Sequence, residues 1–109
     1  MNLSDLQKTI ADFVAEYNLE IPVQMRLLDL LSEIGEVSKE VLKGTQYGRK
    51  GFVPTEEWAS ELGDVLFALI CVANSTNVDL RESLQNVLEK YRQRLAVTGD
   101  AGSDNRSSS

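Results

Sequence analysis

The chain has 109 residues, which suits a single domain, and 17 acidic against 11 basic residues give it a formal net charge of −6. Binding to the backbone of a nucleic acid needs a basic patch, so this charge argues against a nucleic acid polymer as partner. The chain has no histidine, which excludes Ser-His-Asp and Cys-His catalysis, zinc bound by histidine, and the Glu-x-x-His ligand sets of di-iron helical bundles.

The single cysteine, Cys71, allows no disulfide within the chain and favours a reducing compartment, the cytoplasm. It lies inside the longest uninterrupted apolar run, Val65–Ala73, so we interpret its thiol as part of the core. That run is far too short to cross a bilayer, and the polar N-terminus MNLSDLQKT is unlike a signal peptide. We therefore expect a cytoplasmic protein without a membrane partner.

Two helices are predicted in the first half of the chain. Ser4 and Gln7 fit a capping box for a helix that runs to about Tyr17. Pro22 suits the first position of a second helix, and Gly44 suits its C-cap. The second helix carries an apolar face at helical spacing, made by Leu27, Leu30, Leu31 and Ile34.

The segment from Gly44 to Pro54 is the one substantial internal loop. It contains three glycines, which imply mobility, and the two cations Arg49 and Lys50. It can be a surface connection without further role. Alternatively, it is a flap whose cations meet an anionic ligand.

A third helix is expected to begin at Thr55 as N-cap, with Glu56 and Glu57 in its first turn, and to continue to about Asn74. Every residue from 65 to 73 is apolar, and a helix that is apolar on all sides must be buried on all sides. A thin bundle of short helices cannot easily achieve this. We therefore expect self-association, as a dimer or a tetramer.

The last helix is predicted from a capping box of Asp79 and Glu82 to about Leu95. No alternation long enough to suggest a sheet occurs, so we expect an all-α fold, a small bundle of about four helices within residues 1–97. Residues 98–109, TGDAGSDNRSSS, have almost no apolar side chains and are expected to be a disordered tail. The last helix has a basic face, made by Arg81, Lys90, Arg92 and Arg94.

Two acidic pairs lie on the second and third helices. Glu33 and Glu36 are neighbours on one helical face, and Glu61 and Asp64 repeat the spacing, because an α-helix turns by about 100° per residue. Carboxylates crowded beside an apolar face repel one another and are costly to desolvate. A hard divalent cation relieves both costs, and Mg²⁺ takes oxygen ligands. The alternative is a solvated acidic face on each helix.

The combination of the two acidic pairs resembles the MazG-type all-α nucleoside triphosphate pyrophosphohydrolases. The matching segments cover residues 30–37, 61–67 and 77–80, followed by Lys90, Tyr91 and Arg94, and the resemblance extends from residue 3 to 96. The chain departs from many members at Ser32, where an acid is frequent, and at Leu88, where an Asn is frequent.

The resemblance implies an all-α NTP pyrophosphatase-like fold and hydrolysis of a nucleoside triphosphate between the α and β phosphates. It also implies Mg²⁺, or alternatively Mn²⁺, as cofactor. The implied metal ligands are Glu33, Glu36, Glu61 and Asp64. We assign Glu36 as the base that accepts the proton of the attacking water.

Six further residues are candidates for substrate contacts. Lys90 and Arg94 lie one turn apart, so both can reach one polyphosphate, although they also suit a solvated helix end. Trp58 and Asn74 are candidates to meet a base, with a core position and a helix end as their alternatives. The loop cations Arg49 and Lys50 complete the set.

Two other functions remain open at this point. The chain can be a noncatalytic helical dimer that acts as a regulatory or partner-binding module. It can also carry out related chemistry on another pyrophosphate-linked substrate, such as phosphoribosyl-ATP.

Overall fold

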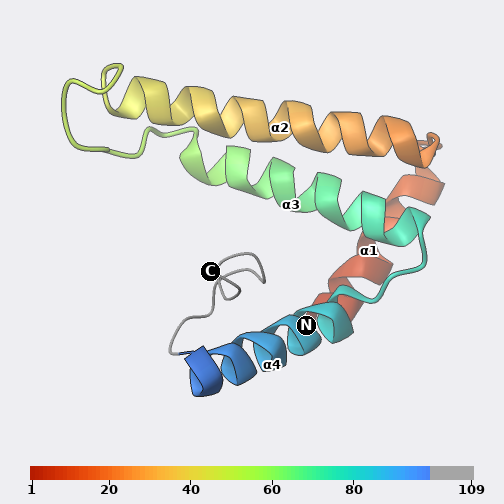
Figure 1. Ribbon diagram of the computed structural model, residues 1–109. Helices are drawn as coiled ribbons and strands as arrows, with labels where there is room; N and C mark the ends of the chain where they lie inside the picture. The colour runs from red at the N-terminus through yellow and green to blue at the C-terminus, as the bar shows by residue number, and fades with distance from the viewer. Residues whose placement is uncertain (99–109) are drawn as a thin grey trace.

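Four α-helices form the structure, a computed structural model that describes residues 1–98 (Figure 1). They are α1 (Leu3–Glu16), α2 (Val23–Gly44), α3 (Trp58–Ser75) and α4 (Leu80–Thr98), and no strand occurs within those residues. The all-α prediction is confirmed. Of the predicted tail at residues 98–109, Thr98 is the last residue of α4, and the remainder lies outside the described part of the chain.

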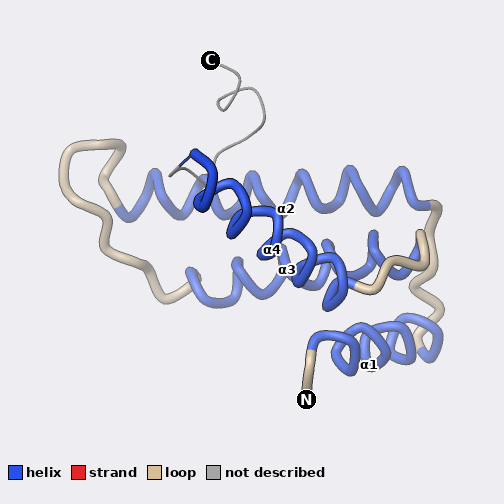
Figure 2. Tube along the Cα trace, turned by 60° about the horizontal axis from the view of Figure 1, so that its bottom comes forward, coloured by secondary structure: helices blue, strands red, loops and turns tan. Residues whose placement is uncertain are grey.

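The helices α2 and α3 form a long antiparallel hairpin, with α1 across one end of it and the connecting loop at the other end (Figures 1 and 2). The fourth helix, α4, packs on α1 and points away from the hairpin (Figure 1). The hairpin is therefore the part of the molecule that can bring distant acidic residues together.

The capping box of α1 differs from the predicted one. Asn2 is the N-cap: its side chain accepts a hydrogen bond from the Asp5 amide at 2.9 Å, and the Asp5 carboxylate accepts from the Asn2 amide at 3.0 Å. Asn is among the strongest N-cap residues, so it displaces the box expected at Ser4 and Gln7. The Ser4 hydroxyl instead donates to Asp79 Oδ1 at 3.0 Å.

Gln7 is buried and ties α1 to the turn between α3 and α4. Its Nε2 donates to Asn74 Oδ1 at 3.1 Å and to the Val78 carbonyl at 2.8 Å, and its Oε1 accepts from the Leu80 amide at 2.8 Å. The Asn74 Nδ2 donates back to the Gln7 carbonyl at 3.0 Å. These bonds satisfy the buried amides and fix where α4 begins.

The predicted helix ends are displaced by one to three residues, as is common. Pro22 is the N-cap of α2 and not its first residue, and Gly44 is the last helical residue before the C-cap Thr45. The third helix starts at Trp58 after a turn, with Glu57 as N-cap. Thr55 is not the N-cap of α3: its hydroxyl donates to the Glu40 carboxylate of α2 and accepts from the Glu57 amide at 3.3 Å, and the helix begins only after Glu57.

The fully buried core is small and lies mostly on α3. Ala68, Ile70, Cys71 and Ala73 are buried, whereas Leu66 and Leu69 of the same helix keep 46% and 39% of their surface exposed. The expectation that residues 65–73 are covered on all sides is therefore not met within one chain. Self-association, which would cover them, stays a prediction.

By length and composition alone, α3 could cross a membrane, since its 18 residues have a mean hydropathy of 1.2. The sequence-based expectation considered only the shorter apolar run inside it. The core helices of soluble proteins reach the same values. Moreover, α3 carries Glu61 and Asp64, which face α2.

Candidate metal centre

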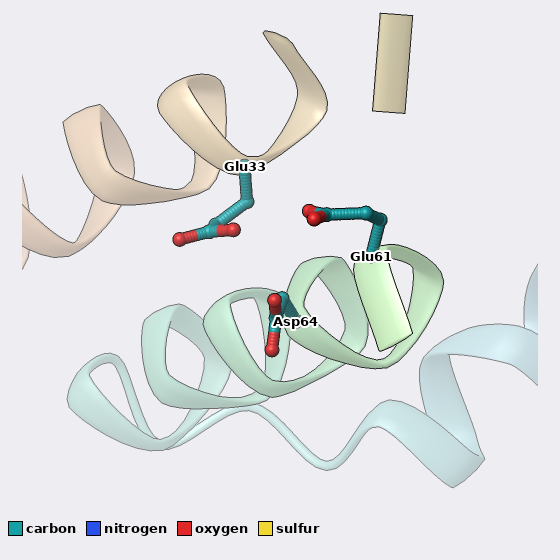
Figure 3. Close-up of side chains that lie close together, drawn as sticks. All are labelled: Glu33, Glu61 and Asp64. Carbon is teal, nitrogen blue, oxygen red and sulfur yellow. The ribbon is translucent and has the colours of Figure 1, made fainter. Parts of the chain in front are cut away.

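Three carboxylates from the two hairpin helices converge at one place (Figure 3). Glu33 on α2 and Glu61 and Asp64 on α3 each offer one carboxylate oxygen, and these oxygens lie within 4.8 Å of one another. Glu33 and Glu61 are half-buried, and Asp64 is exposed. The sequence therefore identified three residues that the fold brings together from positions far apart in the chain.

The convergence follows from the helical spacing and from the antiparallel pairing. Glu61 and Asp64 share one face of α3 because residues three apart are neighbours on a helix. The same pairing of helices places Arg26 of α2 near Cys71 of α3, where both side chains line one cavity. The acidic cluster thus lies between the middle of α2 and the first two turns of α3, on the loop side of Arg26 and Cys71.

Electrostatic crowding is evident in the pKa values of this cluster. Partial burial raises the pKa of Glu33, and the neighbouring charges of Asp64, Asp29 and Glu36 raise it further. Partial burial likewise raises the pKa of Glu61, with Asp64 and Glu36 as the largest of the charges that add to it. Glu33 and Glu61 therefore ionise less readily than they would in water, and a cation would relieve this cost.

The donor set fits a hard divalent cation. All three groups are oxygen donors, which Mg²⁺ and Ca²⁺ prefer. Ligand oxygens at about 2.1 to 2.4 Å from one such ion are at most about 4 to 5 Å apart, in agreement with the spacing of 4.8 Å or less. The residues present can therefore hold such an ion.

Glu36 lies beside the cluster but outside the set of three. Its negative charge raises the pKa of both Glu33 and Glu61. Its carboxylate pairs with Lys39 Nζ at 3.6 Å, one turn along the exposed side of α2. Its roles as fourth ligand and as base remain predictions.

Glu40 is a buried carboxylate whose structural role the sequence did not predict. It is 4% exposed, accepts a hydrogen bond from the Thr55 hydroxyl and pairs with Lys43 Nζ at 3.2 Å. The bond from Thr55 lowers the pKa of Glu40, and Lys43 adds to this effect against the cost of burial. Glu40 therefore holds the start of α3 against α2, close to the acidic cluster. The spacing of Glu40 and Lys43 could be seen in the sequence, but the contact between Glu40 and Thr55 could not.

The end of the loop is anchored on α2. The Val53 amide donates to the Gly44 carbonyl at 3.0 Å. A Cβ at Gly44 would lie 2.6 Å from the Phe52 ring and 2.7 Å from the Val53 carbonyl, so only glycine fits there. Phe52 packs edge-on against Trp58, with ring centroids 5.0 Å apart. Trp58 thus contributes to this anchor.

The two loop cations are exposed at the far end of the hairpin. The amides of Arg49 and Lys50 donate to the Thr45 carbonyl at 2.9 and 3.1 Å, so this part of the loop is a hydrogen-bonded turn. Their side chains form no ion pair with the residues that the structure describes.

The α4 cations are not brought to the carboxylates within one chain. Lys90 and Arg94 both lie against the Tyr91 ring, with Lys90 Nζ at 5.6 Å and Arg94 Cζ at 5.9 Å from its centroid. The helix that carries them points away from the hairpin (Figure 1). The side chain of Asn74, the other candidate for substrate contacts, is bonded to Gln7.

Comparisons with known proteins found a family and relatives that match most of this chain. A family model described as the MazG nucleotide pyrophosphohydrolase domain matches residues 23–96. The uncharacterised protein YpjD of Bacillus subtilis (strain 168) is 34% identical over 94 residues, which are 84% of this chain and 80% of that protein.

Two crystal structures are similar to most of this chain. One is the Bacillus-conserved MazG protein, a nucleotide pyrophosphohydrolase, with a TM-score of 0.70 and 30% identity over 84% of this chain and 89% of that one. The other is YPJD from Bacillus subtilis, with a TM-score of 0.71 and 29% identity over 86% and 96%. The resemblance seen in the acidic pairs is confirmed, and the chain belongs to the MazG nucleotide pyrophosphohydrolase family, enzymes that hydrolyse acid anhydrides.

Proposed function

We propose that this protein is a Mg²⁺-dependent nucleoside triphosphate pyrophosphohydrolase that cleaves between the α and β phosphates and releases a nucleoside monophosphate and pyrophosphate. The observation that carries the proposal is the convergence of Glu33, Glu61 and Asp64 within 4.8 Å on the hairpin of a MazG family member. Carboxylates alone would repel a triphosphate, so this arrangement is productive only with a cation between them.

In the proposed reaction, Glu33, Glu61 and Asp64 hold the metal, with Glu36 beside them. When bound, the metal neutralises charge on the phosphate oxygens and orients an in-line attack by water. The water oxygen bonds to phosphorus, the bridging P–O bond breaks, and a carboxylate of the cluster takes the proton. Glu36 is our choice for this base, since it lies beside the cluster but outside the set of three.

Substrate binding requires positive charge from elsewhere in the protein. A triphosphate brings several negative charges to a cluster that is already acidic, and one divalent ion offsets only part of them. We assign this role to Lys90 and Arg94, with Arg49 and Lys50 as weaker contributors. Because α4 points away from its own hairpin, Lys90 and Arg94 would have to act on the site of another copy.

Self-association is part of the proposal for a second reason. Leu27, Leu31 and Ile34 recur at helical spacing on α2, and all three are exposed within one chain, Leu31 at 65%. Leu62, Leu66 and Leu69 form a matching exposed row on α3. Large contiguous apolar patches on soluble proteins mark interaction sites. A second copy, in a dimer or a tetramer, would cover both rows.

We further place the enzyme in the cytoplasm, with no role for a membrane or for a nucleic acid polymer. The net charge of −6 disfavours the backbone of nucleic acids. The noncatalytic alternative is not supported, because the chain belongs to a family of hydrolases.

The test is pyrophosphate release from a panel of nucleoside triphosphates, with and without Mg²⁺, and with Mn²⁺ as a second metal. We expect release from at least one triphosphate that depends strictly on the metal. Phosphoribosyl-ATP belongs in the panel as the competing substrate class. No release from any triphosphate at high enzyme and metal concentration would overturn the proposal.

A further inference from the structure

A second site lies at the end of the hairpin that α1 crosses. A half-open cavity of about 220 Å³ is lined by α1, by the turn that follows it, and by the facing ends of α2 and α3. Part of its wall is apolar, made by Ala11, Val14 and Ile21. The remainder is made by Glu20, Arg26, Cys71, Asn74 and Ser75. The cavity therefore combines an apolar wall with one cation, Arg26, and one carboxylate, Glu20, which forms no ion pair with it.

Arg26 is buried and forms no ion pair among the described residues, although Glu20 lines the same cavity. It is only 8% exposed, and its guanidinium donates one hydrogen bond, to the carbonyl of Leu19 after α1. Among residues 1–98, no carboxylate lies within ion-pair distance of it. A buried charge with a single neutral partner is costly, and it indicates that a further acceptor is missing.

The unused nitrogens of Arg26 are accessible from the cavity. No buried side-chain nitrogen of the described residues lacks a hydrogen-bond partner, so the nitrogens that do not contact Leu19 retain accessible surface. Arg26 lines the cavity and keeps only 8% of its surface exposed, so we infer that this surface faces the cavity. A ligand there would meet N–H donors in a planar arrangement.

The cavity and the acidic cluster lie on the same hairpin, and the cavity is the one nearer to the end that α1 crosses. Arg26 is two helical turns before Glu33, and Cys71 is two turns after Asp64, so each pair shares a helical face with an offset of about 10 Å. A nucleotide whose phosphates lie at the carboxylates would extend its base over a comparable length. An apolar wall suits a planar base. A phosphate placed against it would lose hydration at a high cost in free energy.

We propose that this cavity binds the nucleobase of the substrate, and that Arg26 donates hydrogen bonds to a carbonyl oxygen of that base. Bases with a carbonyl at this edge are then preferred over bases with an amino group, because an amino group would face N–H donors and leave them unpaired. This inference rests on the proposed function and names its substrate class.

The test uses triphosphates that differ at one edge of the base: uridine against cytidine, and inosine against adenosine. We expect kcat/KM to favour the carbonyl member of each pair by about tenfold to a hundredfold. In Arg26→Met the two ratios should fall to near one, mainly because KM rises for the carbonyl members. The stabilisation by metal alone should persist, since the carboxylates are untouched.

Two further variants separate recognition from folding. Arg81→Met removes an exposed cation from α4 and should leave both ratios unchanged. Arg26→Lys keeps the charge and should retain a reduced preference, which preserves the test if Arg26→Met fails to fold. Equal ratios in the wild type, or an Arg26→Met variant that melts earlier but keeps its base preference, would show that Arg26 only anchors the Leu19 carbonyl.

Binding of inosine and adenosine monophosphates, measured by calorimetry, distinguishes failure of this inference from failure of the proposed function. If no triphosphate is hydrolysed but inosine monophosphate binds more tightly than adenosine monophosphate, and Arg26→Met removes the difference, the base subsite stands alone. If hydrolysis proceeds without any base preference that depends on Arg26, the subsite is wrong and the function stands.

Discussion

The α2–α3 hairpin and α4 use their charged residues in different ways. The hairpin brings Glu33, Glu61 and Asp64 together inside one chain, because two long helices pair in a fixed register. The fourth helix has no buried residue and holds Lys90 and Arg94 away from those carboxylates. The comparison leads us to predict that a single chain can bind the metal, whereas nucleotide binding needs a second copy that brings the cations of α4 to the site.

The strongest test of this division removes two carboxylates. In Glu61→Gln combined with Asp64→Asn, we expect the rise in melting temperature caused by Mg²⁺ to vanish and turnover to fall by orders of magnitude, because both ligands on α3 lose their charge. Circular dichroism should still show the helices. Glu82→Gln combined with Glu89→Gln, exposed acids of α4, is the matched control. A metal-dependent shift that survives in the first pair would exclude these ligands.

The next test asks whether the exposed side of the hairpin is covered in solution. Leu69 is 39% exposed in one chain. If a partner covers it, Leu69→Asp places an unpaired charge in an apolar interface and should cost several kcal/mol, which dissociates or unfolds the protein.

The control for this test is Val97→Asp, at an exposed position near the end of α4. Sedimentation velocity and thermal melting together read out assembly and stability. A folded monomer at micromolar concentration, in the wild type or in Leu69→Asp without loss of stability, would mean that one chain is sufficient.

A smaller effect is expected from the cations of α4. Lys90→Ala and Arg94→Ala should each weaken nucleotide affinity by about tenfold to a hundredfold, equivalent to roughly 1.5 to 3 kcal/mol for a charge-assisted hydrogen bond. Arg49→Ala and Lys50→Ala should have less effect, since ordering a glycine-rich loop costs entropy. Metal binding without nucleotide should be unchanged in all four variants.

The comparison for these variants is Arg92→Ala, because Arg92 lies on the same helix and pairs with Glu89 at 3.5 Å. Nucleotide affinity and turnover are measured at saturating Mg²⁺. Wild-type kinetics in the Lys90 and Arg94 variants would assign both residues to a solvated helix end.

The same comparison explains what the sequence could predict. The acidic pairs of the hairpin were found because their i, i+3 spacing is local, and an antiparallel pairing of the two helices then brings them together. Arg26 and Glu40 were missed because their roles depend on Leu19 and Thr55, contacts that no local pattern indicates. The position of α4 was equally inaccessible, because the network around Gln7 that fixes its start joins residues about 70 positions apart.

The smallest expected effect concerns how stability changes with pH. Its sign should differ between Glu40 and the acidic cluster of Glu33 and Glu61. The pKa of Glu40 is lowered from its ordinary value of 4.5, first by the hydrogen bond from Thr55, so its contribution to stability is present above pH 4.5 and is lost as pH falls through its folded pKa. The pKa values of Glu33 and Glu61 are raised by partial burial and by neighbouring carboxylates. Their ionisation therefore destabilises the fold as pH rises from 4.5 through their folded pKa values.

Without metal, Glu33→Gln should consequently melt a few degrees higher than the wild type at neutral pH and lose this advantage below pH 4.5. Glu40→Gln should melt lower at neutral pH, and its deficit should shrink only in stronger acid. Melting curves of the three proteins from neutral to acid pH, with a chelator present, measure both slopes. Added Mg²⁺ should remove the advantage of Glu33→Gln by stabilising the wild type, and should leave the deficit of Glu40→Gln in place. If both variants changed with pH in the same direction, the crowding at the cluster would not be electrostatic, and the case for a cation between these carboxylates would lose its physical basis.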